Sequence, residues 1–230
     1  MSNHIAIATE NGIQTIRLQR PDKMNALTND MYQQMADALK NSNRQSDIKV
    51  NIISGEKGCF TAGNDIKDFL AYAETGNLAD GVIDFLTSLG TLDKPLILAI
   101  DGPAIGIGTT MAFHADLVYA TSNALFQTPF LDLGLIPEAA SSYLMPKSIG
   151  YVRAYEMLAL GEPFPAEKAL NAGIINAIVD SDQLDEHVQK VALRLAKKPM
   201  QAMLTTKRLM SGDREKIMQV MEVETEIFAR

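Results

Sequence analysis

The sequence predicts one α/β domain, with strands and helices alternating over the first two-thirds of the chain and helices dominating the last third. Short aliphatic runs bounded by turn residues recur between segments with helical spacing, which is the pattern of strand–helix units. No linker or change of composition separates the two parts. We therefore expect residues 1–180 to form an α/β core and residues 181–230 to form a helical region of the same domain.

The individual elements follow from local signals. Residues 4–10 and 13–18 flank Asn11-Gly12, a two-residue turn that favours a β-hairpin. Thr28 or Asn29 is expected to cap a helix that continues to about residue 42. The other strands are expected at 49–54, 95–100, 117–120, 124–127 and 174–179. The other helices are expected at 78–91, from 108 to about 115, and at 138–145, 148–159, 165–171, 182–196, 200–210 and 213–229.

The composition argues against several classes of protein. A net charge of −7 and a pI of about 5.0 make nucleic acid a poor partner. The single cysteine, Cys59, cannot form an internal disulfide, which fits a reducing compartment. The aliphatic run at 95–100 is far shorter than the ~20 residues that span a bilayer, and the N-terminal residues lack the features of a secretory signal. We expect a cytoplasmic protein that binds neither nucleic acid nor membrane.

Two strand–glycine–helix transitions, at 60–66 and 98–109, are the unusual feature of the sequence. Backbone N–H groups at a helix start lack intrahelical partners, and glycine lets a substrate approach the backbone closely. Two such starts facing one cavity would offer two donors to a single oxygen, which is the arrangement of an oxyanion hole. Either turn alone is better explained as a tight turn into a packed helix.

Nucleotide and metal sites are poorly supported. The spacing of Gly102, Gly106 and Gly108 does not match the dinucleotide fingerprint, because Met111 stands where the last glycine is required. The P-loop pattern fails as well, since no lysine precedes the threonines at 109–110. His114 and Asp116 form no ligand set in a chain with three histidines. We expect no metal and no separate cofactor.

Six stretches resemble the crotonase (enoyl-CoA hydratase/isomerase) superfamily, in the order of the family and over about residues 20–180. They are 20–27 (RPDKMNAL), 59–67 (CFTAGNDIK), 99–108 (AIDGPAIGIG), 115–120 (ADLVYA), 126–138 and 167–175 (EKALNAGII). This resemblance implies a crotonase-like spiral of ββα units with a helical C-terminal trimerisation region. It also implies an acyl-coenzyme A thioester as substrate and a homo-oligomer, either a trimer or a dimer of trimers.

The resemblance assigns roles to individual residues. The backbone N–H groups of Asn64 and Ile107 would bind the thioester oxygen. The residues that would line the coenzyme A channel and the acyl pocket are Lys23, Asn25, Ala26, Leu27, Ala62, Gly63, Asp65, Ile66, Gly106, Phe130 and Leu133.

The chain departs from the family's hydratases at their two glutamates. Thr110 and Phe130 occupy those positions, and hydration usually needs both carboxylates to activate water and deliver a proton. Ordinary hydration is therefore not expected. A different carboxylate, Glu138, follows Pro137 in a stretch (IPEAASSY, 136–143) that looks like the Δ3,Δ2-enoyl-CoA isomerases, in which a glutamate at this place is the sole acid–base group.

On this resemblance Glu138 would take a proton from C2 of a 3-enoyl thioester and return it at C4. Apolar surroundings would raise the basicity of the carboxylate, whereas a helix start at Pro137 would lower it. Glu138 is otherwise explained as a solvent-facing glutamate in a first helical turn. Further alternatives are Asp132 as a second acid, a hydratase or other acyl-CoA activity, and a non-catalytic acyl-CoA-binding protein. Lys207 and Arg208 are expected on a solvated face.

Overall fold

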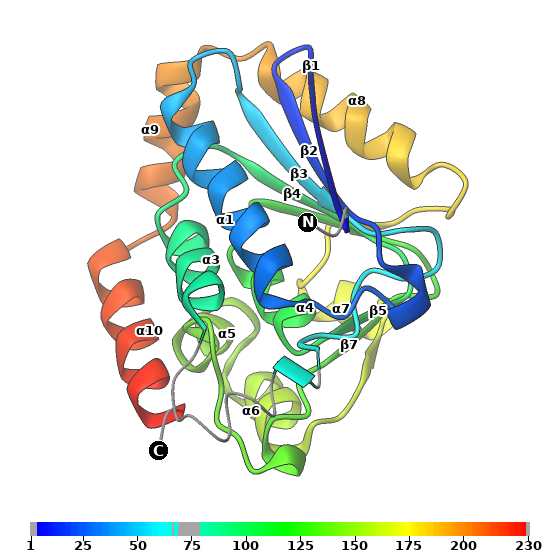
Figure 1. Cartoon of the computed structure of the whole chain (residues 1–230), viewed down its shortest axis with the longest axis vertical. Coiled ribbons are helices and arrows are strands. Elements are labelled where there is room, and N and C mark those ends of the chain that lie inside the picture. The colour runs from blue at the N-terminus through cyan, green and yellow to red at the C-terminus, as the bar shows by residue number, and fades with distance from the viewer. Residues whose placement is uncertain (1–3, 66, 69–78, 229–230) are drawn as a thin grey trace.

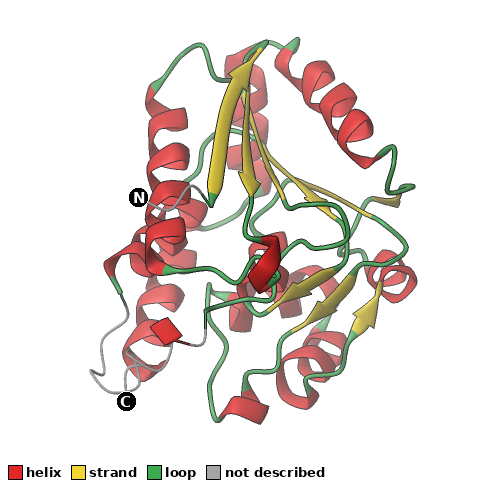
Figure 2. Ribbon diagram, turned by 45° about the vertical axis from the view of Figure 1, so that its right-hand side comes forward, coloured by secondary structure: helices red, strands yellow, loops and turns green. Residues whose placement is uncertain are grey.

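A computed structural model describes residues 4–65, 67–68 and 79–228, and within them the strands form two sheets (Figures 1 and 2). The larger sheet has the order β1-β2-β3-β4-β6-β9 and the smaller has the order β5-β7-β8. The strands of the larger sheet are β1 (Ile5–Glu10), β2 (Ile13–Leu18), β3 (Val50–Ser54), β4 (Leu96–Ile100), β6 (Leu117–Ala120) and β9 (Ala177–Ile178). Those of the smaller sheet are β5 (Pro103–Ile105), β7 (Leu125–Gln127) and β8 (Phe164–Pro165).

The predicted hairpin is confirmed. Strands β1 and β2 pair antiparallel, with Glu10 opposite Ile13. Asn11 and Gly12 between them have φ values of 52° and 78°, the left-handed conformations that a tight hairpin turn requires. From β2 onward the larger sheet is parallel.

Helices cover both faces of the larger sheet. Figure 1 shows α1 (Asn29–Arg44) and α3 (Asp80–Gly90) side by side on one face and α8 (Leu184–Ala196) on the other. This explains why every residue of β3 and β4 is buried. The remaining helices are α4 (Ile107–Thr110), α5 (Ser141–Ile149), α6 (Tyr151–Leu160), α7 (Ala166–Ala172), α9 (Met200–Met210) and α10 (Arg214–Phe228), with 3-10 turns η1 (Pro21–Lys23), η2 (Met111–Phe113) and η3 (Leu131–Leu133).

Helix α1 starts where the sequence indicates. The Thr28 side chain accepts a hydrogen bond from the Met31 N–H at 3.3 Å, so Thr28 is the N-cap. Met31 and Met35 are fully buried on the face that packs toward the sheet. The burial of each such side chain contributes roughly 1.5–3 kcal/mol relative to exposure.

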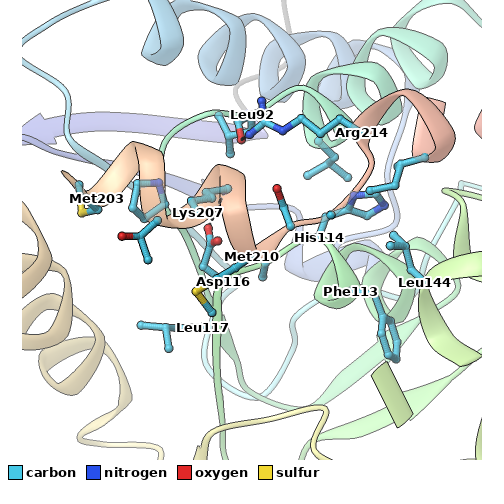
Figure 3. A pocket seen from close by; sticks show the side chains of 18 of the residues that line it. Leu92, Phe113, His114, Asp116, Leu117, Leu144, Met203, Lys207, Met210 and Arg214 are labelled. Carbon is cyan, nitrogen blue, oxygen red and sulfur yellow. Dashed lines mark hydrogen bonds and ion pairs between the residues drawn. The ribbon is translucent and has the colours of Figure 1, made fainter. Parts of the chain in front are cut away.

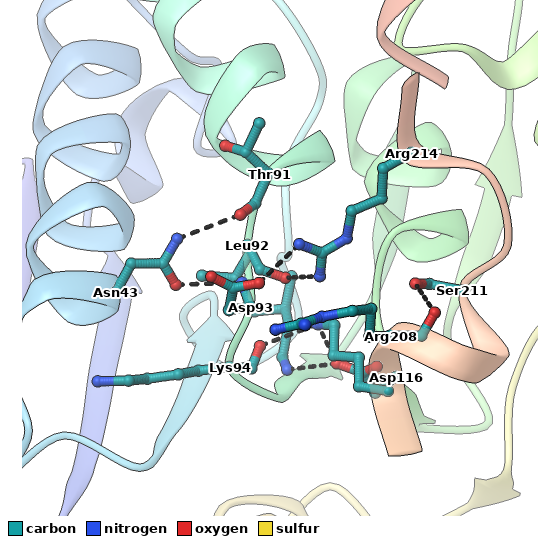
Figure 4. Close-up of polar contacts among 11 residues, drawn as sticks. Asn43, Thr91, Leu92, Asp93, Lys94, Asp116, Arg208, Ser211 and Arg214 are labelled. Atoms are coloured by element: carbon teal, nitrogen blue, oxygen red, sulfur yellow. Dashed lines mark hydrogen bonds and ion pairs between the residues drawn. The ribbon is translucent and has the colours of Figure 1, made fainter. Parts of the chain in front are cut away.

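Ion pairs fasten the C-terminal helices to the sheet (Figure 4). On α9, the Lys207 ammonium donates to Asp116 at 2.7 Å, and the Lys207 side chain is only 10% exposed. At the start of α10, Arg214 pairs with Asp93 at 2.6 Å. The expectation that Lys207 lies on a solvated face is therefore wrong, because the residue anchors its helix.

Three element boundaries differ from the prediction. The helix expected after residue 108 begins at Ile107 and tightens into the 3-10 turn η2 after four residues. The strand expected at 174–179 is confined to β9, because Ile174 turns back to bond with Ala169 at the end of α7. The helix expected from residue 138 begins only at Ser141, because of a turn in the candidate site that is described below.

Strands β5 and β8 were not anticipated, since they are only three and two residues long and show no alternation. Among the described residues no helix combines the length and apolar character needed to cross a bilayer. The division of the domain at residue 180 stays a prediction.

Candidate active site

The two glycine turns lie side by side. A parallel bridge joins Thr61 to Ala104, with the Thr61 N–H donating to the Pro103 carbonyl at 2.9 Å and the Ile105 N–H donating to the Thr61 carbonyl at 3.0 Å. In a parallel pair, residues at equal offsets from a bridge lie level with one another. Asn64 and Ile107 each follow their bridge residue by three positions. The bridge thus brings together the two segments that the sequence predicts to form an oxyanion hole.

Within the described part of the chain, the N–H groups of Asn64 and Ile107 have no hydrogen-bond acceptor. The adjoining N–H groups of Gly63, Asp65 and Gly106 are all bonded to protein oxygens. Because backbone donors are almost always paired when buried, a free donor in each of two neighbouring turns indicates a place for an external acceptor.

Glycine is required at both turns. Gly63 has a φ of +89°, and a Cβ there would lie 3.1 Å from the Ile105 carbonyl oxygen. Gly106 has a φ of 55° and a ψ of −116°, a conformation that residues with a side chain rarely adopt. These two glycines allow the turns to approach each other and aim their following N–H groups outward.

The predicted base, Glu138, is buried. It is 8% exposed, and its Oε1 atom has no hydrogen-bond partner among the described residues. Burial raises the pKa of Glu138 to about 7, and the negative charge of Glu224 adds to this rise, while the nearby Thr110 hydroxyl opposes it. The alternative of a solvent-facing glutamate is therefore wrong. No helix start opposes the effect of burial, because α5 begins three residues later.

Two neighbouring side chains, Thr110 and Tyr32, relate Glu138 to the turns that carry Ile107 and Asn64. Thr110, whose hydroxyl influences the Glu138 pKa, is the last residue of the short helix that Ile107 begins. On the other side, the Tyr32 hydroxyl of α1 donates a hydrogen bond to the side-chain oxygen of Asn64. Burial raises the pKa of Tyr32, and the charge of Glu138 raises it further, so the phenol and the carboxyl lie within electrostatic reach. Glu138 therefore lies within electrostatic reach of one side chain beside each of the two turns.

The turn that carries Glu138 has an unusual backbone. Ala139 and Ala140 have φ values of 58° and 54°, a left-handed conformation that costs a residue with a side chain about 1–2 kcal/mol. The Ala139 carbonyl accepts a hydrogen bond from His114 Nε2 at 2.7 Å. The Ala140 N–H donates to the Glu224 carboxylate at 2.6 Å. The two alanines cannot continue a helix backward from Ser141, which explains the late start of α5.

The family of the chain follows from comparison with known proteins. The sequence matches the family described as Enoyl-CoA hydratase/isomerase over residues 8–230. The chain belongs to this family.

Individual relatives differ in length and in name. The chain is 34% identical over 229 residues to Enoyl-CoA delta isomerase 2 of Rattus norvegicus, with 97% of this chain aligned to 58% of that protein. It is 34% identical over 206 residues to 1,2-epoxyphenylacetyl-CoA isomerase of Escherichia coli (strain K12), with 86% and 78% of the two chains aligned. The solved structure of Pseudomonas aeruginosa OdaA is similar at a TM-score of 0.94 and 40% identity, over 99% of this chain and 93% of that one. The chain thus spans little more than half of its rat relative.

In this member of the enoyl-CoA hydratase/isomerase family, the residues expected to line the ligand channel fall into two groups. Asn25 is fully buried and holds the loops together, since its side chain donates to the carbonyls of Cys59 and Phe60 at 3.0 and 3.1 Å. Leu27 is buried and bridges Asn64. Asp65 pairs with Arg20 at 2.6 Å, which holds its pKa below the usual range. The side chains of these three residues are thus engaged within the protein.

The second group includes exposed, half-buried and buried side chains. Lys23 is exposed and Ala26 and Ala62 are half-buried. Phe130 is only 5% exposed and its ring edge lies next to Gly106, whereas Leu133 is 64% exposed. Ile66 lies outside the described residues. Substrate contacts by all these residues stay predictions.

The sequence analysis missed two polar residues of this site, Tyr32 and Glu224, and considered His114 only as a metal ligand. A signal for Glu224 is present in the sequence: it follows Ile217 and Met221 at helical spacing, and all three are buried on one face of α10. An acidic residue within an apolar stripe of this kind usually has a specific partner. No such pattern marks Tyr32.

A cavity of about 790 Å³ lies between η2, α9 and the start of α10, apart from this site (Figure 3). Its lining includes Phe113, His114, Leu144, Met203 and Lys207, but not Glu138 or the two free N–H groups. Among the described residues no cluster of His, Cys, Asp and Glu side chains is suited to a metal ion.

Proposed function

We propose that this protein is an enoyl-CoA isomerase that converts a 3-enoyl-CoA to a 2-enoyl-CoA with Glu138 as the sole acid–base group. The observation that carries the proposal is the burial of one carboxyl with a pKa of about 7 where the hydratase carboxylate positions hold Thr110 and Phe130. A base whose pKa lies near the working pH is suited both to remove and to return a proton.

The reaction needs two functions that the site can supply. Glu138, when ionised, would remove a proton from C2 and then deliver it to C4, so the double bond moves without any attacking water. The negative charge that develops on the thioester oxygen would be bound by the N–H groups of Asn64 and Ile107. Each such donor is worth roughly 2.7–4 kcal/mol in the transition state. A single carboxyl is sufficient because the proton is returned to the same molecule.

Apolar neighbours favour this chemistry over hydration. Phe130 and Met111 are both buried, at 5% and 0% exposure. Neither can position or activate a water molecule in the way that a second carboxylate would. The rat relative named Enoyl-CoA delta isomerase 2 supports the same choice. The substrate is then an acyl-CoA thioester that requires no additional cofactor, and the family resemblance favours a homo-oligomer.

The test is an assay of Glu138→Gln with a panel of 3-enoyl-CoA thioesters. We expect conversion to the conjugated product to fall at least about a thousandfold, as for removal of an essential catalytic group, while the Kd for a saturated acyl-CoA stays within about threefold. Glu222→Gln, which changes an exposed glutamate of α10, is the control. Full activity in Glu138→Gln would end the proposal.

The same panel separates the alternatives. Loss of the conjugated absorbance of crotonyl-CoA, at a rate exceeding isomerisation, would favour a hydratase. Tight thioester binding with no turnover of any member would favour a non-catalytic binding protein.

A further inference from the structure

The turn of residues 138–142 is fastened by a carboxylate from a distant helix. Glu224 of α10 accepts hydrogen bonds from the Ala140 N–H at 2.6 Å, from the Ser142 N–H at 3.1 Å and from the Ser142 hydroxyl. Every contact is a donor to Glu224, which fits the ionised form of the carboxyl. Glu224 therefore satisfies the first N–H groups of α5 in place of a local N-cap residue, and Ala140 at that position offers no side-chain acceptor.

The position of Glu224 is energetically unusual. The residue is 6% exposed; burial raises its pKa, the three donors oppose this rise, and no cation from the described residues acts on it. A buried carboxylate beside a second buried carboxyl is unfavourable unless its hydrogen bonds are strong. The position of Glu224 therefore indicates a role in addition to capping α5.

The titratable groups around Glu138 indicate what Glu224 does at this turn. Within the described part of the chain, the titratable groups that face Glu138 and its turn are Tyr32 of α1, His114 after η2, and Glu224. Burial lowers the pKa of His114, so its ring is neutral at pH 7 and Nε2 carries the proton donated to Ala139. Among the described residues, Glu224 is thus the negative charge that acts on Glu138, and the Lys207 ammonium acts on His114 on the other side of the turn.

We infer that Glu224 is a positioning residue for Glu138: through its hydrogen bonds to Ala140 and Ser142, its carboxylate holds the left-handed turn that keeps the Glu138 carboxyl buried in the site. The inference rests on the proposed role of Glu138 as the base. It assigns a function to the last helix of the described chain, which contacts α5 at this point.

Two readouts test the inference in Glu224→Gln. In kcat/KM for isomerisation, we expect about a tenfold loss and an acid limb displaced to lower pH by on the order of one pH unit, because removing the neighbouring negative charge makes Glu138 a weaker base. In ¹³C NMR of carboxyl-labelled glutamate, the Glu138 resonance, assigned by its loss in Glu138→Gln, should titrate at correspondingly lower pH. A role in folding alone would lower stability or rate without moving either titration.

Glu224→Asp separates position from charge. It retains the charge on a side chain one methylene shorter, so we expect a reduced kcat with the acid limb close to that of the parent protein. This variant also keeps the test available if Glu224→Gln does not fold. Glu222→Gln, on the exposed side of the same helix, should leave both readouts unchanged.

The outcomes separate the inference from the proposed function. An unchanged Glu138 titration together with kcat/KM within twofold in Glu224→Gln would overturn the inference. Full activity in Glu138→Gln would instead overturn the proposed function, while the NMR titration would still report whether Glu224 acts on Glu138.

Discussion

Replacing Glu138 by glutamine should stabilise the protein in a manner that depends on pH. The Glu138 carboxyl has a pKa of about 7 in the fold, against an ordinary value of 4.5. Between these values the folded protein retains a proton that the unfolded chain has released, so the free energy of unfolding decreases as pH rises through this window. At about 1.4 kcal/mol per pH unit, the full loss above pH 7 amounts to about 3 kcal/mol.

Glutamine resembles the protonated carboxyl and does not ionise, so Glu138→Gln should recover this free energy. Each kcal/mol raises the Tm of a chain of this size by about 2–4 °C, so the variant should melt roughly 6–12 °C above the parent protein at pH 8. At pH 4.5 and below, the two melting temperatures should nearly coincide. The stabilised variant is also the one expected to lose isomerase activity.

Thermal melts of both proteins from pH 4.5 to pH 8, followed by circular dichroism, provide the measurement. Glu222→Gln serves as the control because that side chain is exposed, and its melting temperature should follow that of the parent protein. A difference between Glu138→Gln and the parent that is the same at both ends of the pH range would refute the reasoning, since it would show that Glu138 titrates normally.

Gly63→Ala is expected to lower kcat about a hundredfold, because a Cβ 3.1 Å from a neighbouring carbonyl would shift the following N–H donor. Gly58→Ala, at a φ of +78° with open space around it, controls for backbone strain, and equal losses in the two variants would contradict the assignment. Tyr32→Phe removes the hydrogen bond from the tyrosine hydroxyl to the Asn64 side chain and should lower kcat about tenfold in a steady-state assay. Lys207→Met leaves a carboxylate unpaired and should lower the free energy of unfolding by about 2 kcal/mol in urea titrations, with exposed Lys216→Met as the unaffected control.

The local signals in the sequence predicted most of the larger sheet and its helices. Asn11-Gly12 indicates its hairpin through backbone conformations that few other residue pairs favour, and Thr28 indicates the start of α1 through its side-chain acceptor. These features depend only on neighbours along the chain. They were therefore readable before any tertiary contact was known.

The turn at Glu138 was not readable in the same way. Ala139 and Ala140 are good helix formers, so the sequence favours a helix where the structure has a left-handed turn. The turn is stabilised by Glu224, which lies 84 residues beyond Ala140 in the chain. This long-range contact outweighs the helix propensity of the two alanines, and no residue close to Ala140 in the sequence indicates it.

The residues of the candidate site likewise divide into those that local sequence predicts and those that depend on contacts between distant segments. The glycine turns were identified from spacing alone, but that Glu138 belongs beside them came from the family resemblance. Tyr32 was missed because a buried tyrosine on an apolar helix face is indistinguishable in sequence from a core residue, and only its hydrogen bond to Asn64 reveals the difference.

Because the bridge between Thr61 and Ala104 joins the two loops at one point, we expect activity to depend more on the length of the loops after the bridge than on the side chains within them. Both N–H groups belong to the main chain, three residues beyond the bridge, so exchanging the side chain of Ile107 leaves an N–H in place, whereas exchanging that of Asn64 also removes its hydrogen bond with Tyr32. A single-residue insertion or deletion in either three-residue span would instead rotate one donor away from the other. Substitutions at these two positions are thus expected to alter activity. A one-residue change in the length of either loop is expected to abolish it.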